Sequence, residues 1–92
     1  MNIGEVRTFP IENLPEPRVQ ALKIVEEAAE VFGACDVYRV NETPNLRQAI
    51  ILECSDVIQA TCNLLSLLNV DDASYLMELC EERNKKRGRY DL

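Results

Sequence analysis

The sequence contains no histidine and no tryptophan, and only three of its 92 residues are glycines. The lack of histidine excludes a di-iron carboxylate bundle, which needs a Glu-x-x-His motif on two helices. Three scattered glycines exclude a glycine-rich phosphate loop, and the acidic loop with a central glycine that an EF-hand requires is missing as well. A mostly aliphatic composition with 5% aromatic residues favours packed helices over a sandwich or barrel.

Cysteine is present four times, but never as a CxxC pair (Cys35, Cys54, Cys62 and Cys80). Without histidine, a zinc site would need all four thiolates or help from carboxylates, and the spacing does not suggest either. Each cysteine lies in an apolar, helical context, where a free thiol behaves as a small hydrophobic group. The sequence shows no signal peptide and no long apolar span, so we expect a soluble, cytoplasmic protein with reduced thiols and no membrane partner.

The formal net charge of −6 argues against binding to nucleic acid, because affinity for a phosphate backbone comes mainly from lysine and arginine. It does not exclude a small phosphorylated ligand, since positive charge is concentrated in the stretch Arg83–Arg89. Hydrophobic residues make up 47% of the chain, which is more than a single core of this size needs. We therefore expect part of the apolar surface to be buried between subunits.

The chain reads as one all-α domain over residues 1–92, with a proline-punctuated lead-in segment at 1–16 and a basic tail at 84–92. Apolar spacing predicts helices from about Pro17 to Ala34 and from Leu46 to Leu68, joined by a connection at 35–44. A shorter third helix is expected to begin after Asp71 or Asp72, either of which can cap it, and to end near Arg87. The predicted fold is a small helical bundle that is completed by oligomerisation.

Two pairs of carboxylates lie inside these apolar segments, Glu27 with Glu30 and Glu53 with Asp56. Residues three apart share one face of a helix, so the two pairs converge if the first two helices pack antiparallel. Four converging carboxylates repel one another unless some are protonated or a cation lies between them. A site made only of carboxylates favours Mg²⁺, with Mn²⁺ as a substitute.

Glutamate at helical spacing usually marks nothing more than a solvated face. The second helix argues against that interpretation, because neutral polar side chains accompany its two acids where an ordinary solvent face would carry lysines. They are Ser55, Gln59, Asn63 and Ser66. A semi-buried polar surface of this kind favours a metal site.

The pattern Glu27-x-x-Glu30, 22 intervening residues and Glu53-x-x-Asp56 resembles the ExxE…ExxD signature of the MazG-like all-α nucleoside triphosphate pyrophosphohydrolases. The ending ERNKKRGRY, Glu82 to Tyr90, is similar to the basic C-terminal motif of that family, and the resemblance covers roughly Leu22 to Tyr90. It implies a Mg²⁺-dependent hydrolase that converts a nucleoside triphosphate into the monophosphate and pyrophosphate, in cleansing or control of the nucleotide pool. It also implies a homodimer or homotetramer.

The resemblance further implies a role for individual residues. The expected metal ligands are Glu27, Glu30, Glu53 and Asp56. The residues expected to hold phosphates are Lys23, Lys85, Lys86 and Arg87, and those expected to contact sugar or base are Asn84 and Tyr90. Glu26, Glu27 and Glu53 would be the catalytic carboxylates, with Glu26 orienting a water or a lysine, or accepting a proton.

Two alternatives of another class remain. The chain could be a non-catalytic helical interaction module, whose acidic face docks a basic partner and whose Arg83–Arg89 stretch is solvated. It could also be a nucleotide sensor that keeps the site but lacks turnover. Both alternatives share the predicted fold and differ from the hydrolase in what the carboxylates do.

Overall fold

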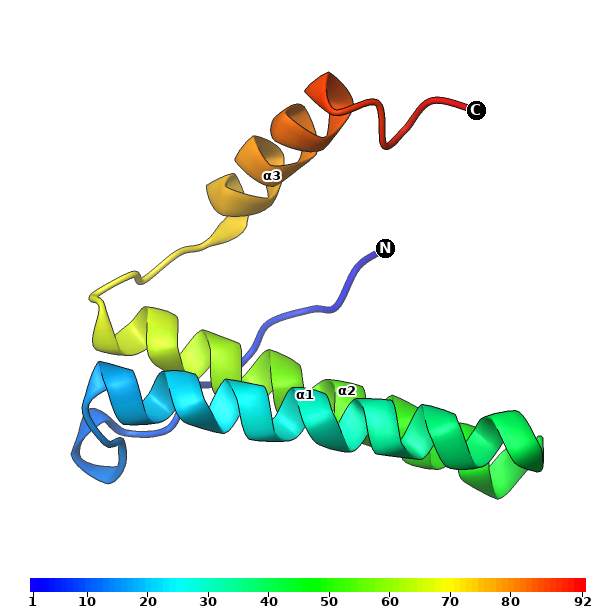
Figure 1. Cartoon of the computed structure of the whole chain (residues 1–92). Coiled ribbons are helices and arrows are strands. Elements are labelled where there is room, and N and C mark those ends of the chain that lie inside the picture. The colour runs from blue at the N-terminus through cyan, green and yellow to red at the C-terminus, as the bar shows by residue number, and fades with distance from the viewer.

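The computed structural model describes residues 1–92, and the chain forms helices only, which confirms the all-α class. The elements are the 3-10 turn η1 (Ile11–Asn13) and the helices α1 (Pro17–Val40), α2 (Pro44–Leu67) and α3 (Ser74–Lys86). Helices α1 and α2 lie side by side as an antiparallel hairpin, and α3 rises from the end of α2 and points away from it (Figure 1). Each hairpin helix has 24 residues and is therefore about 36 Å long.

Helix α1 is six residues longer than predicted, because it passes through Gly33 and ends at Val40 instead of Ala34. Glycine in a helix interior costs about 1 kcal/mol relative to alanine, which made Gly33 a plausible end point. The helix continues because Ala34 and Tyr38, four residues apart, are half-buried on the side of α1 that also carries Val31. The predicted connection therefore shrinks to residues 41–43.

Most of the other helix ends follow the signals in the sequence. The Thr43 side chain caps α2 by accepting a hydrogen bond from the Leu46 amide at 3.2 Å, and Pro44 occupies the first turn. The expected aspartate cap of α3 is wrong, because the N-cap residue is Ala73; Asp72 Oδ1 instead accepts a hydrogen bond from the Ser74 amide at 2.9 Å in the turn before the helix. Gly88 has a φ of 73°, a left-handed conformation that favours glycine, and it ends α3 directly after the C-cap residue Arg87, where the sequence predicted the end.

The most deeply buried positions between the two helices of the hairpin are mostly polar. The only buried residues are Gln20, Ala60 and Asn63, and two of these three carry side-chain amides. The amide Nε2 of Gln20 donates a hydrogen bond to the Ala60 carbonyl at 3.0 Å, which ties α1 directly to α2. Such a bond matters because a buried amide without a partner is costly.

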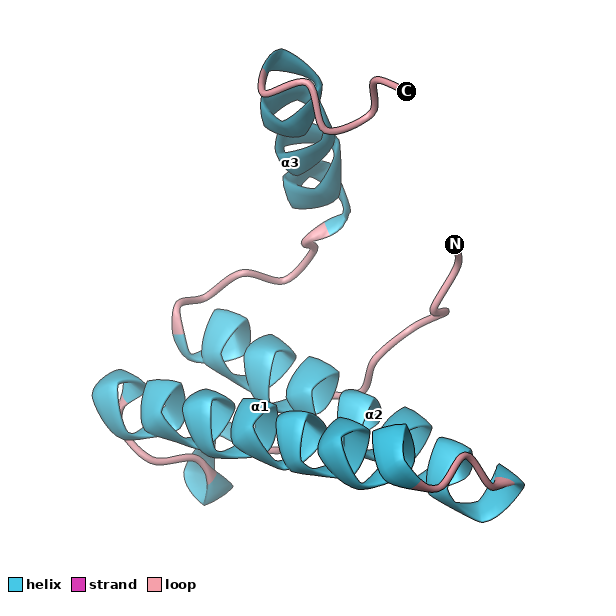
Figure 2. Ribbon diagram, turned by 45° about the vertical axis from the view of Figure 1, so that its right-hand side comes forward, coloured by secondary structure: helices cyan, strands magenta, loops and turns pink.

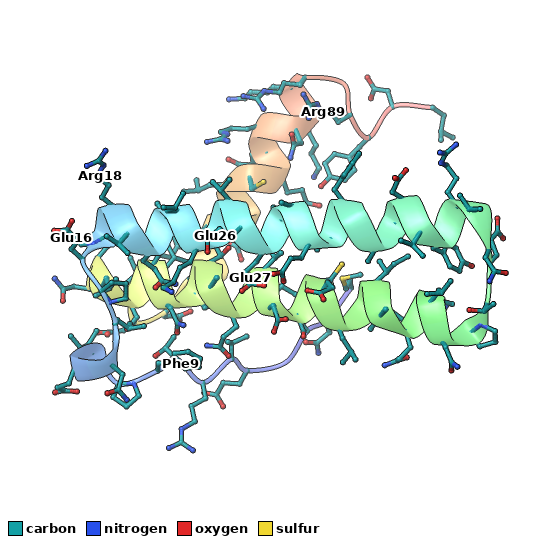
Figure 3. All side chains as sticks on the ribbon, turned by 60° about the horizontal axis from the view of Figure 1, so that its bottom comes forward. Phe9, Glu16, Arg18, Glu26, Glu27 and Arg89 are labelled. Carbon is teal, nitrogen blue, oxygen red and sulfur yellow. The ribbon has the colours of Figure 1, made fainter.

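The lead-in segment is largely extended and passes beside α2, while its N-terminal end projects away from the hairpin (Figures 2 and 3). Asn63 Oδ1 accepts hydrogen bonds from the Phe9 amide at 3.0 Å and from Gln59 Nε2 at 3.1 Å. The same Gln59 nitrogen also donates to the Arg7 carbonyl at 3.1 Å. Two amide side chains of α2 thus hold the arm in place, although they lie more than 50 residues away in sequence.

The apolar stripe predicted for the first helix lies on the outside of the hairpin. Its side chains stay exposed, up to 74% for Phe32. The exposed members are Val19, Leu22, Val25 and Phe32. Helix α3 packs on neither α1 nor α2, and the radius of gyration is 15.5 Å, against about 12 Å for a compact domain of this length. A single chain does not bury these surfaces, so the expected oligomerisation stays a prediction.

Helix α2 is long and apolar enough to cross a membrane by length and composition, so the expectation that the chain has no long apolar span was wrong. This is weak support for a span, because a core helix of a soluble protein passes the same test. Glu53 and Asp56 lie near its middle, where a charged group in lipid is expensive. The expected cytoplasmic location stays a prediction.

Replacing Asn63 with alanine should release the arm and lower the free energy of unfolding by about 1–3 kcal/mol, because the Phe9 amide loses its partner. Urea unfolding at fixed protein concentration measures the change. Ser55→Ala is the matched control, since that exposed hydroxyl bonds only the Leu52 carbonyl of its own helix, and it should cost less than about 0.5 kcal/mol. If Asn63→Ala lowers the free energy of unfolding by no more than the control does, the hydrogen bond from the Phe9 amide does not hold the arm in place.

Candidate metal centre

Four carboxylates meet where α1 and α2 face each other. Glu27 and Glu30 come from α1, Glu53 and Asp56 come from α2, and one oxygen of each lies within 4.8 Å of the others. The i, i+3 spacing puts each pair on one face of its helix, and the antiparallel hairpin brings the two faces together. Glu27 points into the space between the helices, whereas Arg18 points away from the hairpin (Figure 3). We call these four residues the carboxylate cluster.

The cluster has an inner and an outer half. Glu30 and Asp56 are exposed, whereas Glu27 and Glu53 are half-buried and each has one oxygen, Oε2, shielded from solvent. Neither of these two shielded oxygens has a hydrogen-bond partner within the chain. A shielded, unpartnered carboxylate oxygen is unfavourable, so the inner half of the cluster favours binding of a proton or a cation.

The protonation of the cluster responds to this crowding. Burial is the largest cause that raises the pKa of Glu27 above its usual 4.5, and the adjoining carboxylate of Glu30 adds to it. Hydrogen bonding to the Glu30 carboxyl group is the largest cause that raises the pKa of Glu53, followed by burial. Both shifts have the direction expected for like charges that share a site without a counterion.

The donor set fits a hard divalent cation. All four ligands are carboxylates, and no histidine exists in the chain to favour zinc or iron. Mg²⁺ takes oxygen ligands and keeps several waters, which suits a cluster with two exposed members. The residues present therefore match the predicted ligands of a Mg²⁺ or Mn²⁺ ion, while occupancy and the identity of the ion stay predictions.

A groove of about 300 Å³ opens beside the cluster, between the arm and the hairpin. Glu27 and Asp56 form one part of its wall, and Lys23, one turn before Glu27, brings a positive charge into it. Phe9 lines it from the arm, on the α2 side of the hairpin (Figure 3). The other lining residues are Asn13, Leu14, Pro15, Gln20, Gln59, Ala60 and Asn63. The wall of the groove therefore contains carboxylates, the ammonium group of Lys23 and neutral side-chain amides.

The structure separates the other predicted site residues. Glu26 is exposed on α1 and lies outside the cluster. Asn84 donates a hydrogen bond from Nδ2 to Cys80 Sγ at 3.4 Å within α3, and Lys85, Lys86 and Arg87 are exposed on or next to that helix. Tyr90 is exposed in the tail. Within a single chain, α3 does not pack against the hairpin that carries the cluster.

Gln20 and the arm residue Phe9 line the groove although neither belongs to the predicted site. A signal for Gln20 was present, because it lies seven residues before Glu27 and therefore on the same side of α1. Phe9 gave no such signal, since its position depends on a backbone hydrogen bond to Asn63, 54 residues away. Gln59 and Asn63 were recognised as polar residues beside the acids, but their role in holding the arm was not.

Comparisons with known proteins do not extend this description: no family model, no curated protein and no solved structure matches the chain. The functional interpretation therefore depends on the cluster, the groove and the charges around them.

Without metal, the melting temperature should fall as the pH rises above about 4.5. In the folded chain, Glu27 and Glu53 keep their protons to a higher pH than they do in the unfolded chain, because their pKa values are raised. Their contribution to stability is therefore complete below about pH 4.5, and it is lost as the pH rises through the raised pKa values. Added Mg²⁺ should reverse this trend, because it binds the deprotonated carboxylates of the native state. Thermal melts at about pH 5 and about pH 7.5, with and without millimolar Mg²⁺, measure both effects.

Glu26→Gln is the matched control for this experiment, because the same change is made one residue outside the cluster. It should keep the full stabilisation by Mg²⁺ at the higher pH, whereas Glu53→Gln should lose most of it. An equal response to Mg²⁺ at both pH values, or in both variants, would contradict a metal site at the cluster.

Proposed function

We propose that this protein is a Mg²⁺-dependent nucleoside triphosphate pyrophosphohydrolase of the MazG-like type, which releases a nucleoside monophosphate and pyrophosphate. The observation that carries the proposal is the pair of shielded, unpartnered oxygens on Glu27 and Glu53 within a cluster of four carboxylates. An ordinary acidic helix face leaves its carboxylates in water, with no need for a counterion.

The groove supports the choice of substrate. A triphosphate is strongly negative, so it approaches an acidic cluster only where cations offset the repulsion. Lys23 lies in the groove wall together with Glu27. A metal ion bound at the cluster would offset negative charge on the phosphate oxygens and would lower the pKa of a bound water. At about 300 Å³, the groove lies at the lower end of the range typical of small-molecule sites.

In the proposed reaction, the oxygen of water forms a bond to one phosphorus of the α–β anhydride, and the bond from that phosphorus to the bridging oxygen breaks. The bridging oxygen leaves with its electron pair on the other phosphoryl group, so one water and one triphosphate give a monophosphate and pyrophosphate. Glu26, exposed beside the cluster and not part of it, would accept the proton of the attacking water. Lys23 would hold a phosphate oxygen as negative charge develops on the leaving group.

We further propose that the active form is a homodimer or homotetramer. The exposed apolar stripe of α1 is regularly spaced along the helix, from Val19 to Phe32, which is typical of a helix that packs against another on that side. A second hairpin placed against this stripe would form a bundle in which the polar inner seam and the apolar outer stripe are both covered. This arrangement accounts for a composition that is 47% hydrophobic although only three residues are buried.

Incubation with Mg²⁺ and a panel of NTPs and dNTPs, including dUTP and dCTP, should yield monophosphate and pyrophosphate in equal amounts. Chromatography that resolves them from diphosphate and phosphate tests the bond that is cleaved. Glu53→Gln should lower turnover by about 100-fold or more, because it removes a metal ligand whose oxygen is shielded. It should not lower the metal-free melting temperature, since the substitution removes one charge from a crowded cluster.

The assay also separates the alternatives. Mg²⁺-dependent stabilisation by a nucleotide without any product would replace the hydrolase with a sensor. The absence of both product and Mg²⁺-dependent stabilisation would favour the interaction module, whose acidic face needs no cation. A Glu53→Gln variant with near-normal turnover would show that the cluster is not the reaction centre.

A further inference from the structure

The wall of the groove contains three side-chain amides that are bound at one end only. They are Gln20, Gln59 and Asn63. Gln20 Nε2 donates a hydrogen bond to the Ala60 carbonyl at 3.0 Å. Both hydrogens of Gln59 Nε2 are used, since this nitrogen donates to the Arg7 carbonyl and to Asn63 Oδ1, each at 3.1 Å. The side-chain oxygens of Gln20 and Gln59 are therefore left as free acceptors.

Asn63 has the opposite polarity at its free end. Its Oδ1 accepts from the Phe9 amide at 3.0 Å as well as from Gln59, so its Nδ2 is left as a free donor. Backbone partners fix which end of each amide is free, because a main-chain N–H can only donate and a main-chain carbonyl can only accept. The groove therefore offers two acceptors and one donor of fixed identity.

Two of these free ends belong to almost completely buried side chains. Gln20 and Asn63 are each 2% exposed. Gln20 Oε1 and Asn63 Nδ2 are nevertheless not fully shielded, so the little surface that these side chains keep includes the free atoms. Buried amides normally have their polar atoms partnered, because a missing hydrogen bond inside a protein is costly. Free ends at this depth in the wall of a groove indicate a polar ligand.

The polar groups of the groove have a fixed order along both helices. On α1, Gln20 and Lys23 precede Glu27 by seven and four residues, which places all three on one face of the helix. On α2, Asn63 follows Asp56 by seven residues, and the antiparallel hairpin puts it at the same end as Gln20. Seven residues of helix span about 10 Å, the scale of a nucleotide from its phosphates to the outer edge of its base. The groove thus leads from the carboxylate cluster past an ammonium group to neutral amides.

We propose that the amide end of the groove binds a nucleobase that carries an exocyclic amino group, in preference to uracil or thymine; this choice of substrate rests on the proposed function. In cytosine and adenine, the two amino hydrogens match the free acceptors, and the ring nitrogen beside them matches the free donor. Guanine achieves the same match with its amino group, its ring N–H and its carbonyl. Uracil and thymine have a single ring N–H between two carbonyls, so one acceptor of the groove is left unpaired.

Phe9 supplies an apolar surface at the same end of the groove. Its backbone amide is held by Asn63, while its side chain lines the groove and stays 51% exposed (Figure 3). A base whose edge meets the amides stacks its face on this ring, a contact that any base can make because every base has a π face. The ring therefore contributes affinity, and the amides contribute the preference for an amino group.

Binding of analogues that cannot be cleaved tests the preference without any measurement of turnover. The probes are dCTP and dUTP in which an NH group replaces the oxygen between the α- and β-phosphorus, and isothermal titration calorimetry with Mg²⁺ measures their Kd for the full chain. The dCTP analogue should bind about tenfold more tightly, because uracil leaves one acceptor unpaired. The same analogues of GTP and ITP form a second matched pair, since hypoxanthine is guanine without its amino group. Equal affinities within either pair would overturn the proposal.

Gln59→Leu tests the amides directly, because it removes one free acceptor while the bond between Phe9 and Asn63 still holds the arm. The dCTP analogue should lose its advantage over the dUTP analogue, since each base can satisfy the single acceptor that remains. Thr61→Val is the matched control on the same helix and should keep the preference, because this exposed hydroxyl bonds only the Val57 carbonyl. A Gln59→Leu variant with an unchanged ratio of the two Kd values would show that Gln59 only holds the arm, and would overturn its role in selecting the base.

Phe9→Ala tests the ring apart from the amides. The backbone amide that binds Asn63 is kept, so both pyrimidine analogues should bind about tenfold more weakly while the ratio of their Kd values stays the same. Ile11→Ala is the matched control, because Ile11 belongs to the same arm and is 50% exposed but does not line the groove. It should leave both Kd values unchanged, and a loss as large as that of Phe9→Ala would refute stacking on the ring.

The binding experiment fails or succeeds separately from the proposed function. Hydrolysis of both dCTP and dUTP, together with equal affinity for their analogues, would overturn the preference for an amino group and leave the hydrolase in place. Tighter binding of the dCTP analogue without product from any nucleotide would remove the hydrolase and support the base site. If neither analogue binds, the base site is refuted.

Discussion

The constraint on which the rest of this structure depends is the pair of shielded carboxylate oxygens between two long helices. Glu27 and Glu53 occupy positions that face the opposite helix, where an ordinary hairpin would place leucine or valine. Crowding and burial raise the pKa values of both groups, so a proton or a cation at the cluster stabilises the seam. The neighbouring amides of Gln20 and Asn63 extend the polar character of the seam, and their hydrogen bonds fix the hairpin and the arm around the cluster.

A polar seam has consequences for the outside of the hairpin. Ala60 is the only fully buried apolar residue, and apolar side chains such as Val31 and Val57 are half-buried, so a single chain uses only part of its hydrophobic residues for its own stability. The apolar side chains are instead placed on the outer stripe of α1 and on α3, where another chain can cover them. The carboxylate cluster and the exposed apolar surface are therefore two results of one arrangement of residues, since polar groups at the seam displace apolar ones to the outside.

Much of this organisation could be predicted from the sequence. The i, i+3 spacing of the acids was sufficient to predict that they share a helix face, and Pro17, Thr43 and Gly88 mark helix ends by local chemistry. The end of α1 could not be predicted in the same way, because packing of Ala34 and Tyr38 outweighs the local cost of Gly33. The groove was not predictable either, since its wall at Phe9 depends on a hydrogen bond between segments that are remote in sequence.

Metal binding and assembly should be thermodynamically linked in such a protein. A cation that neutralises the cluster removes the repulsion between α1 and α2 and fixes the hairpin, and a fixed hairpin presents the outer stripe of α1 in the geometry that a second chain needs. By reciprocity, a second chain that holds two hairpins in place keeps the carboxylates at the separation a cation requires.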